Sequence, residues 1–462
     1  MLLLRRHSNR GTSHTAIGKR IVRSKNNMHE EPDFFILGKA YITGRVVNAA
    51  IGISGEKIVS LTSPGNIPPS ARRREYGDGF LVVPGMVDIH VHMREPGLEY
   101  KEDWRTGSMA AVKGGVTFVA DMPNNKPPAN NCNILREKLE RAKRKSIVDY
   151  AFYAGFNIIP EELSECKDLY IGGKIYPEDL YSPNVEEFAR LIASQYKILI
   201  VHAENPSLLK PDAKILHSIA RPPESEKSAV KKTLELALQT GARTHITHIS
   251  LADSIIEILK AKLAGHPVTL DTAPHYFLLN DSLYTTSRKN IAKVNPPLRS
   301  EKDRQSLYIA VNKMLVDAIV TDHAPHLLEE KLGENPPSGF PGLEVALHLL
   351  LREILEGRMP IQVLDLYSFR PASLLGINKG CISIGCDADL VVLRKESWEI
   401  RPDEFVSKAK YSPFEGAVLR TKTHAVFLRG RTVYEEGEFY EDVRGKFYPL
   451  EAPTSYETLQ DR

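Results

Sequence analysis

The middle of the chain alternates short apolar segments with polar, helix-like stretches, and this alternation constrains the fold more than any other feature. Helical periodicity is clearest in residues 225–239 and 253–263. Parallel strands need crossover helices of this kind between them. The predicted strands are residues 87–91, 116–121, 148–154, 170–175, 197–201, 244–249, 267–271 and 318–322.

Side chains that can bind a metal or move a proton lie at the carboxyl ends of nearly all these segments. A barrel brings all strand ends to one rim, whereas an open doubly wound sheet, which has the same local pattern, spreads them along a line. We therefore predict an α/β fold, a (β/α)8 TIM-type barrel with one site at its rim. The strand-end residues are His90, His92, Asn124, Lys174, His202, His248, His275 and Asp322.

Both ends of the chain are rich in short β-like runs broken by glycine. Residues 34–61 contain such runs, and residues 389–393 and 424–434 repeat the pattern near the C-terminus. We predict a small composite β domain from residues 34–83 and 381–445, and a hydrolase barrel over residues 84–380. Residues 1–33 are predicted to be a basic, disordered tail.

Composition and charge exclude several classes of function. The net charge is only +3, and residues 1–27 contain seven Lys or Arg and no acid, so a nucleic-acid role has little support. That stretch resembles a transit peptide in composition. We favour a disordered tail, or a start at Met28, because its one apolar run is too short for a signal core.

Four cysteines, none in a CxxC pair, are too few for a disulfide framework in 462 residues, so we expect a reducing compartment and a cytoplasmic protein. No run approaches the roughly 18 apolar residues that span a membrane.

The segment VDIHVHMREPG carries the strongest local signal. His90 and His92 alternate along a predicted strand, so both imidazoles face the same side and can hold a divalent metal. His202 follows another strand. His245 and His248 lie three apart, on opposite faces unless the strand breaks between them, and His248 is the better ligand because it is nearer the strand end.

Three further residues are candidates for a hydrolytic site. Asp322, in TDHAPH, offers an oxygen ligand and a proton carrier, and His326 can point into the same cavity. Lys174, in an apolar strand, is expensive to bury as a cation. It is either a salt-bridged lysine or a carbamate formed with carbon dioxide, which could bridge two metals. Such a set suits metal-assisted hydrolysis.

The segments HVHMREPG, DMPNNKPP, GGKIY, VHAEN, THIS, VNPPLR, TDHAPH and GFPGLE occur in this order, and the chain resembles the dihydroorotases of the cyclic amidohydrolase family from about residue 84 to 416. The resemblance implies reversible, zinc-dependent cyclisation of N-carbamoyl-L-aspartate to L-dihydroorotate in pyrimidine (UMP) biosynthesis. It also implies two zinc ions, bridged by carboxylated Lys174 and a hydroxide. The implied ligands are His90, His92, Lys174, His202, His248 and Asp322, with Asp322 as the catalytic acid and base.

The resemblance places substrate-binding roles on Arg94, Asn124, Asn295 and His326, and on the backbone around Pro341 and Gly342. Arg94 also has a physical argument, because a guanidinium gives a substrate carboxylate a planar, two-pronged partner. The alternatives are an allantoinase or a hydantoinase or dihydropyrimidinase, which act on less acidic rings, and a non-catalytic scaffold barrel. A homodimer and an association with aspartate transcarbamoylase stay open as partners.

Overall fold

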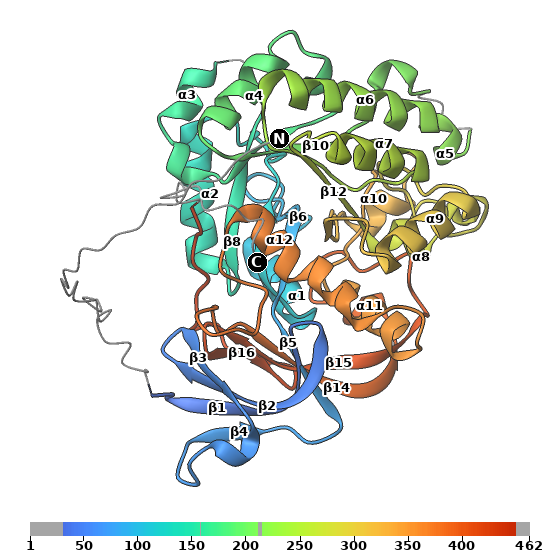
Figure 1. Cartoon of the computed structure of the whole chain (residues 1–462). Helices are drawn as coiled ribbons and strands as arrows, with labels where there is room; N and C mark the ends of the chain where they lie inside the picture. The colour runs from blue at the N-terminus through green and yellow to red at the C-terminus, as the bar shows by residue number, and fades with distance from the viewer. Residues whose placement is uncertain (1–30, 158, 211–214, 450–462) are drawn as a thin grey trace, which may run out of the picture.

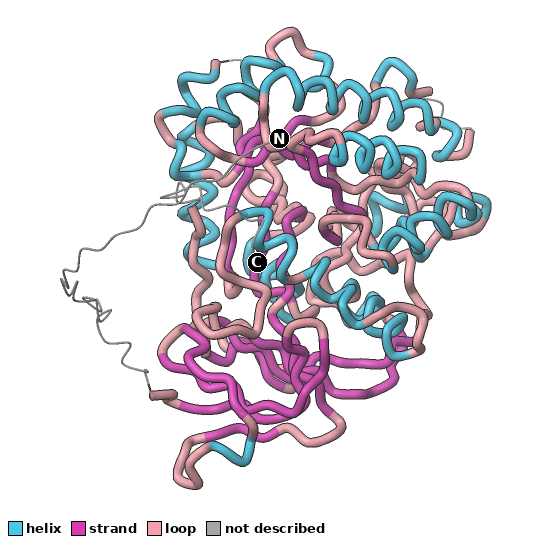
Figure 2. The backbone as a smooth tube through the Cα atoms, viewed as in Figure 1, coloured by secondary structure: helices cyan, strands magenta, loops and turns pink. Residues whose placement is uncertain are grey.

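A computed structural model describes residues 31–157, 159–210 and 215–449. Eight strands form one parallel sheet in chain order, with helices around it (Figure 2). The first and last strands are joined by a parallel bridge between Val91 and His323, and the N–H of His92 donates to the carbonyl oxygen of His323 at 2.8 Å. The predicted barrel is therefore confirmed. Its strands are β6 (Met86–Val91), β7 (Val116–Asp121), β8 (Asp149–Gly155), β9 (Gly172–Ile175), β10 (Ile198–Val201), β11 (Thr244–Ile246), β12 (Val268–Thr272) and β13 (Ala318–Ile319).

Helices cover the barrel because each of the longer ones buries one apolar side against the strands. The two helices with the clearest periodicity in the sequence are α6 and α7, close to their predicted bounds. Side chains of Asp103 and Asn131 cap the starts of α1 and α2. The helices are α1 (Trp104–Lys113), α2 (Cys132–Lys145), α3 (Pro160–Ser164), α4 (Val185–Ser194), α5 (His217–Ala220), α6 (Pro223–Thr240), α7 (Ala252–Leu263), α8 (Pro274–Leu278), α9 (Glu301–Asn312), α10 (Leu328–Leu332), α11 (Ala346–Leu355) and α12 (Phe369–Leu375).

Two predicted barrel strands end earlier than expected, and both ends matter for the site. Strand β11 stops at Ile246 and β13 at Ile319, because His248 and Asp322 have φ angles of 44° and 48°, outside the extended region. The strand therefore does break between His245 and His248.

A second sheet combines strands from both ends of the chain (Figure 1). Strand β5 pairs antiparallel with β14, with Pro84 opposite Leu390. This confirms the predicted sheet from both termini, and residues 424–434 lie in its antiparallel β15–β16 pair. Its strands are β1 (Phe34–Ile42), β2 (Arg45–Ser54), β3 (Lys57–Thr62), β4 (Arg73–Glu75), β5 (Phe80–Pro84), β14 (Leu390–Glu399), β15 (Val418–Leu428), β16 (Arg431–Glu435) and β17 (Glu438–Phe439).

The proposed domain limits stay a prediction, and residues 1–30 of the basic tail lie outside the described part of the chain. Among the described helices, none combines the length and apolar content needed to cross a bilayer.

The four cysteines, which the sequence analysis considered too few for a disulfide framework, form two disulfides. Cys132 is bonded to Cys166, and Cys381 to Cys386, with Cα–Cα distances of 5.6 and 6.3 Å. Both distances lie in the range that a disulfide can bridge. Cys132 lies on α2 and Cys166 lies 34 residues later, so spacing in the sequence did not indicate their proximity.

A buried charge cluster joins the barrel to the composite sheet. The Nζ atom of Lys379 lies 2.6 Å from Asp149, 2.9 Å from Asp387 and 2.8 Å from Asp389. Asp149 opens barrel strand β8, and Asp389 directly precedes β14 of the composite sheet. Arg429 supplies a second cation to Asp149. Buried carboxylates in such numbers persist only when they are paired.

Replacing Lys379 with Met should therefore lower the free energy of unfolding by about 3–5 kcal/mol, because three buried carboxylates lose a shared cation. Urea denaturation followed by circular dichroism measures the loss. Lys39→Met is the control: it breaks the pair with Asp78, whose side chains are 46% and 92% exposed, and should cost less than about 1 kcal/mol. Equal losses in the two variants would contradict a joining role for the cluster.

Candidate metal centre and active site

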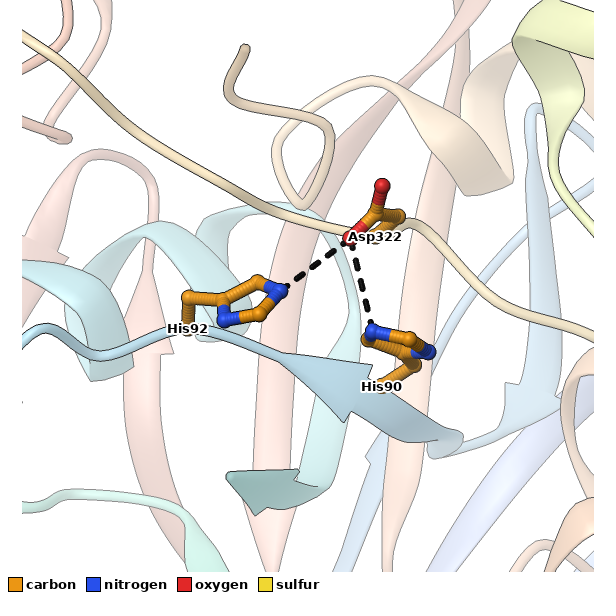
Figure 3. A group of neighbouring side chains, drawn as sticks. All are labelled: His90, His92 and Asp322. Atoms are coloured by element: carbon orange, nitrogen blue, oxygen red, sulfur yellow. Dashed lines mark hydrogen bonds and ion pairs between the residues drawn. The ribbon is translucent and has the colours of Figure 1, made fainter. Parts of the chain in front are cut away.

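Three of the predicted site residues meet where the barrel closes (Figure 3). His90 lies near the end of β6, His92 follows that strand by one residue, and Asp322 follows β13. The Oδ1 atom of Asp322 lies 3.5 Å from His90 Nε2 and 3.2 Å from His92 Nε2. All three side chains are buried. Two imidazole nitrogens and a carboxylate oxygen this close together can share one divalent ion.

Hydrogen bonds fix which nitrogen each of these imidazoles presents. Thr247 donates its hydroxyl hydrogen to Asp271, so at 2.6 Å it accepts the Nδ1–H of His90. Asn124 Oδ1 accepts from His92 Nδ1 at 2.7 Å. Both Nε2 lone pairs are thus left to face Asp322, the arrangement usual for metal-binding histidines. Asn124, predicted to contact substrate, here orients His92.

His202 and His248 lie beside the first group. Their ring centroids are 4.4 Å apart, and His248 is 5.1 Å from the ring of His90. The Nε2–H of His202 donates to Glu204 at 2.7 Å, and Arg221 binds the same carboxylate at 2.6 Å. This leaves His202 Nδ1 as a free ligand atom. The buried Nδ1 of His248 has no hydrogen-bond partner among the described residues.

Lys174 lies one residue before the end of β9, close to the same groups. Its side chain is 0% exposed, and its Nζ atom has no hydrogen-bond partner in the described chain. Burial lowers the pKa of Lys174 to about 7, and the charges of Asp322 and Asp271 only partly oppose this. A buried ammonium without a partner would be costly, so the neutral amine is favoured. A neutral amine is the form that can react with carbon dioxide, so this residue fits a bridging carbamate.

Burial also sets the protonation of the other groups. It holds the pKa values of His90, His92 and His248 well below the usual range, so their imidazoles are neutral and can bind a metal. It raises the pKa of Asp322 to about 7, against the opposing charges of His202 and Lys174. A carboxyl with a pKa near neutrality can both accept and return a proton.

Arg94 and His326 form the wall next to the candidate metal-binding side chains. Arg94 is buried, its Nε–H donates to the carbonyl oxygen of Pro325 at 3.1 Å, and its Nη2 lies 3.2 Å from His326 Nε2. Lys101 donates to His326 Nδ1 at 3.0 Å, so Nε2 carries the hydrogen and donates to the Ser338 carbonyl oxygen. No described carboxylate forms an ion pair with the Arg94 guanidinium.

The other predicted substrate residues lie at two places near this wall. The N–H of Gly342 donates to His323 Nδ1 at 3.2 Å, and a Cβ at Gly342 would lie 3.0 Å from Thr321 Cβ. Pro341 and Gly342 therefore pack against the residues that flank Asp322. Asn295 lies further out, where its Oδ1 is 3.0 Å from His217 Nε2.

Two strand-end histidines do not join the metal group. His245 bonds to Thr269 and Asp271 at 2.8 and 2.7 Å. His275 is buried at the start of α8, and its ring is 4.9 Å from that of Phe340.

Three buried aspartates that the sequence analysis did not single out hold the backbone of the ligand loops. Asp88 accepts from the N–H groups of His90 and Thr321, Asp121 from that of Met93, and Asp271 from that of His248. His248 donates one of these bonds, and Arg94 and Asp322 directly follow residues that donate the others; their φ angles are 44°, 64° and 48°. Left-handed backbone is unfavourable for such residues and persists only where neighbours hold it. The signal that could have identified these residues in the sequence is an aspartate within an otherwise apolar strand.

Comparisons with known proteins show the family of the chain. The amidohydrolase family model matches residues 81–433. A dihydroorotase from Methanothermobacter thermautotrophicus is 36% identical over 423 residues, covering 88% of this chain and 95% of that protein. A dihydroorotase from Pyrobaculum aerophilum is 34% identical, covering 88% and 97%.

The solved structures with similar folds include hydantoinases and dihydropyrimidinases. L-hydantoinase (dihydropyrimidinase) from Arthrobacter aurescens has a TM-score of 0.83 and 25% identity, covering 90% of this chain and 100% of that one. Dihydropyrimidinase from Brevibacillus agri has a TM-score of 0.81 at 24% identity, over 90% and 98%, and shows the fold alone. The chain is an enzyme that hydrolyses cyclic amides, and it belongs to the amidohydrolase family, with dihydroorotases among its relatives in sequence.

Proposed function

We propose that the enzyme is a dihydroorotase, which interconverts N-carbamoyl-L-aspartate and L-dihydroorotate. The observation that carries this proposal is the buried guanidinium of Arg94, which lacks a carboxylate partner among the described residues and lies beside the proposed metal ligands. A buried cation of this kind needs an anion. Dihydroorotate carries a carboxylate on its ring, and it would supply that anion. The dihydroorotases among the relatives support the same choice.

We propose that two zinc ions bind this site, one held by His90, His92 and Asp322 and the other by His202 and His248, with carboxylated Lys174 between them. The unpartnered Lys174 amine and the unpartnered His248 Nδ1 support this ligand set. Zinc held there polarises an amide carbonyl and acidifies a water molecule.

The chain's own residues would then do three things. Arg94 and the backbone near Pro341 and Gly342 hold the substrate carboxylate and ring. Asp322 accepts a proton from the attacking water and returns it to the ring nitrogen as the amide bond breaks. Ring closure uses the same carboxyl in the opposite direction, protonated at the start.

The second candidate is a hydantoinase, dihydropyrimidinase or allantoinase activity, and the hydantoinase structures with similar folds favour it. A neutral ring would leave Arg94 buried without a counter-ion, which is the reason that we place this candidate second. A cytoplasmic location, a homodimer and an association with aspartate transcarbamoylase stay predictions.

Zinc-loaded protein should open L-dihydroorotate and close N-carbamoyl-L-aspartate, followed by the ultraviolet absorbance of the ring. Hydantoin and dihydrouracil should turn over at least about tenfold more slowly, because they do not satisfy Arg94. Removing zinc with a chelator and adding it back is the control for metal dependence. Equal or faster turnover of either neutral ring would overturn the assignment.

Replacing Lys174 with Ala should lower bound zinc from about two ions per chain to about one or fewer, and should reduce kcat/KM by on the order of 100-fold. Plasma emission spectroscopy of the purified variant measures the zinc. Lys197→Met is the matched control, since Lys197 is also buried but its Nζ donates to the Tyr170 carbonyl oxygen at 2.6 Å. Full zinc content in Lys174→Ala would refute the bridging role.

Replacing Arg94 with Met should raise KM for L-dihydroorotate by about 10–100-fold, the value of a lost charged hydrogen bond, and leave the zinc content unchanged. Arg94→Lys keeps the charge but loses the two-pronged geometry, so an intermediate KM is expected. Steady-state kinetics and metal analysis of the same preparations give both readouts. An unchanged KM, or zinc lost together with activity, would argue against a carboxylate-binding role.

A further inference from the structure

A cavity of about 700 Å³ lies beside the proposed active site. Residues from three parts of the chain line it: the segment around α5, the stretch from Tyr284 to Asn295, and the loop that follows α10. The residues on which the argument depends are Lys210, Arg221, Lys289, Lys293, Asn295 and Ser338.

Two chains of hydrogen-bonded residues connect the cavity wall to the proposed site. Arg221 binds Glu204, which accepts a hydrogen bond from His202. The Ser338 carbonyl oxygen accepts from His326 Nε2, and the same nitrogen lies 3.2 Å from Arg94 Nη2. The cavity therefore adjoins both the proposed metal ligands and the proposed carboxylate-binding group.

Positive charge exceeds negative charge around this cavity. Its described lining residues include four cations and one acid, Glu334, and Arg221 is already neutralised by the fully buried Glu204. Among the described residues, none gives the three lysines, Lys210, Lys289 and Lys293, an ion-pair partner. Burial, followed by the nearby charge of Arg221, lowers the pKa of Lys293, as expected where cations repel one another.

A hydrogen bond in the wall determines which end of the Asn295 amide is already engaged. His217 Nε2 lies 2.9 Å from the Val294 carbonyl oxygen and 3.0 Å from Asn295 Oδ1. A carbonyl oxygen only accepts, so Nε2 carries the hydrogen and also donates to Asn295. Asn295 Oδ1 is thereby occupied, and its amide N–H groups are left to donate to an anionic guest.

We propose that this cavity is the substrate entrance and that Lys210, Lys289 and Lys293 attract small dicarboxylates into it. The proposal rests on the proposed function, since N-carbamoyl-L-aspartate carries two carboxylates and L-dihydroorotate one. A cavity with walls of one charge raises the local concentration of an oppositely charged substrate, and the effect grows with the charge on that substrate. The entrance would therefore favour the open, dianionic compound over the ring.

The test uses the double variant Lys210→Gln/Lys289→Gln of the full chain. At about 20 mM salt, kcat/KM for N-carbamoyl-L-aspartate should fall by about tenfold and that for L-dihydroorotate by about threefold. Both losses should shrink at about 300 mM salt, where surface charges are screened. Binding of succinate, an unreactive dicarboxylate, should weaken in parallel by calorimetry.

Two controls separate charge from other effects. Lys210→Arg/Lys289→Arg keeps both charges and should behave as wild type. Lys395→Gln removes one exposed lysine from β14 of the composite sheet, and kcat/KM should stay unchanged for both substrates. Losses of kcat/KM that are equal for the two substrates, or that do not depend on salt, would overturn the proposal that the cavity is the substrate entrance. Wild-type protein that binds succinate through the lysines but turns over neither substrate would overturn the proposed function alone.

Discussion

The hydrogen bonds that Asp88 accepts at the seam of the barrel support the whole proposed site. This one buried carboxylate binds the N–H groups of His90, on the first barrel strand, and of Thr321, after the last. Tyr367 donates its hydroxyl to the same carboxylate at 3.1 Å. Residues more than 230 positions apart are thereby held in one register, and the ligand atoms of His90 and Asp322 stay within reach of a shared ion. Pre-organised ligands of this kind bind a metal without first paying to order the loops.

The fold and the proposed ligands could largely be predicted from the sequence, and the reason is periodicity. His90 and His92 are two residues apart in a strand, so their side chains point to the same face. The carboxyl ends of parallel barrel strands meet at one rim. The strand ends at Ile246 and Ile319 were not predictable, since left-handed backbone at His248 and Asp322 depends on bonds from elsewhere in the chain. The roles of single side chains could not be predicted from the sequence either. Asn124, for example, orients His92.

Contacts between distant segments explain the remaining differences. Cys132 and Cys166 are brought together by the packing of α2 against the turn that contains Cys166, and no local pattern reports such a distance. Glu204 reads in the sequence as an ordinary polar residue after a strand. In the structure it accepts bonds from His202 and Arg221, and so joins a proposed metal ligand to the wall of the cationic cavity.

The pairing of β5 with β14 also has a consequence for how the chain is made. Strands β1 to β5 leave the ribosome first, yet the central partner of β5 begins only at Leu390, after the complete barrel. The nascent chain must therefore carry a sheet with an open apolar edge throughout synthesis of the barrel, at the time when such edges most readily join other chains. That edge can be closed only after the barrel has been synthesised, because its partner strand lies on the far side of the barrel in the sequence.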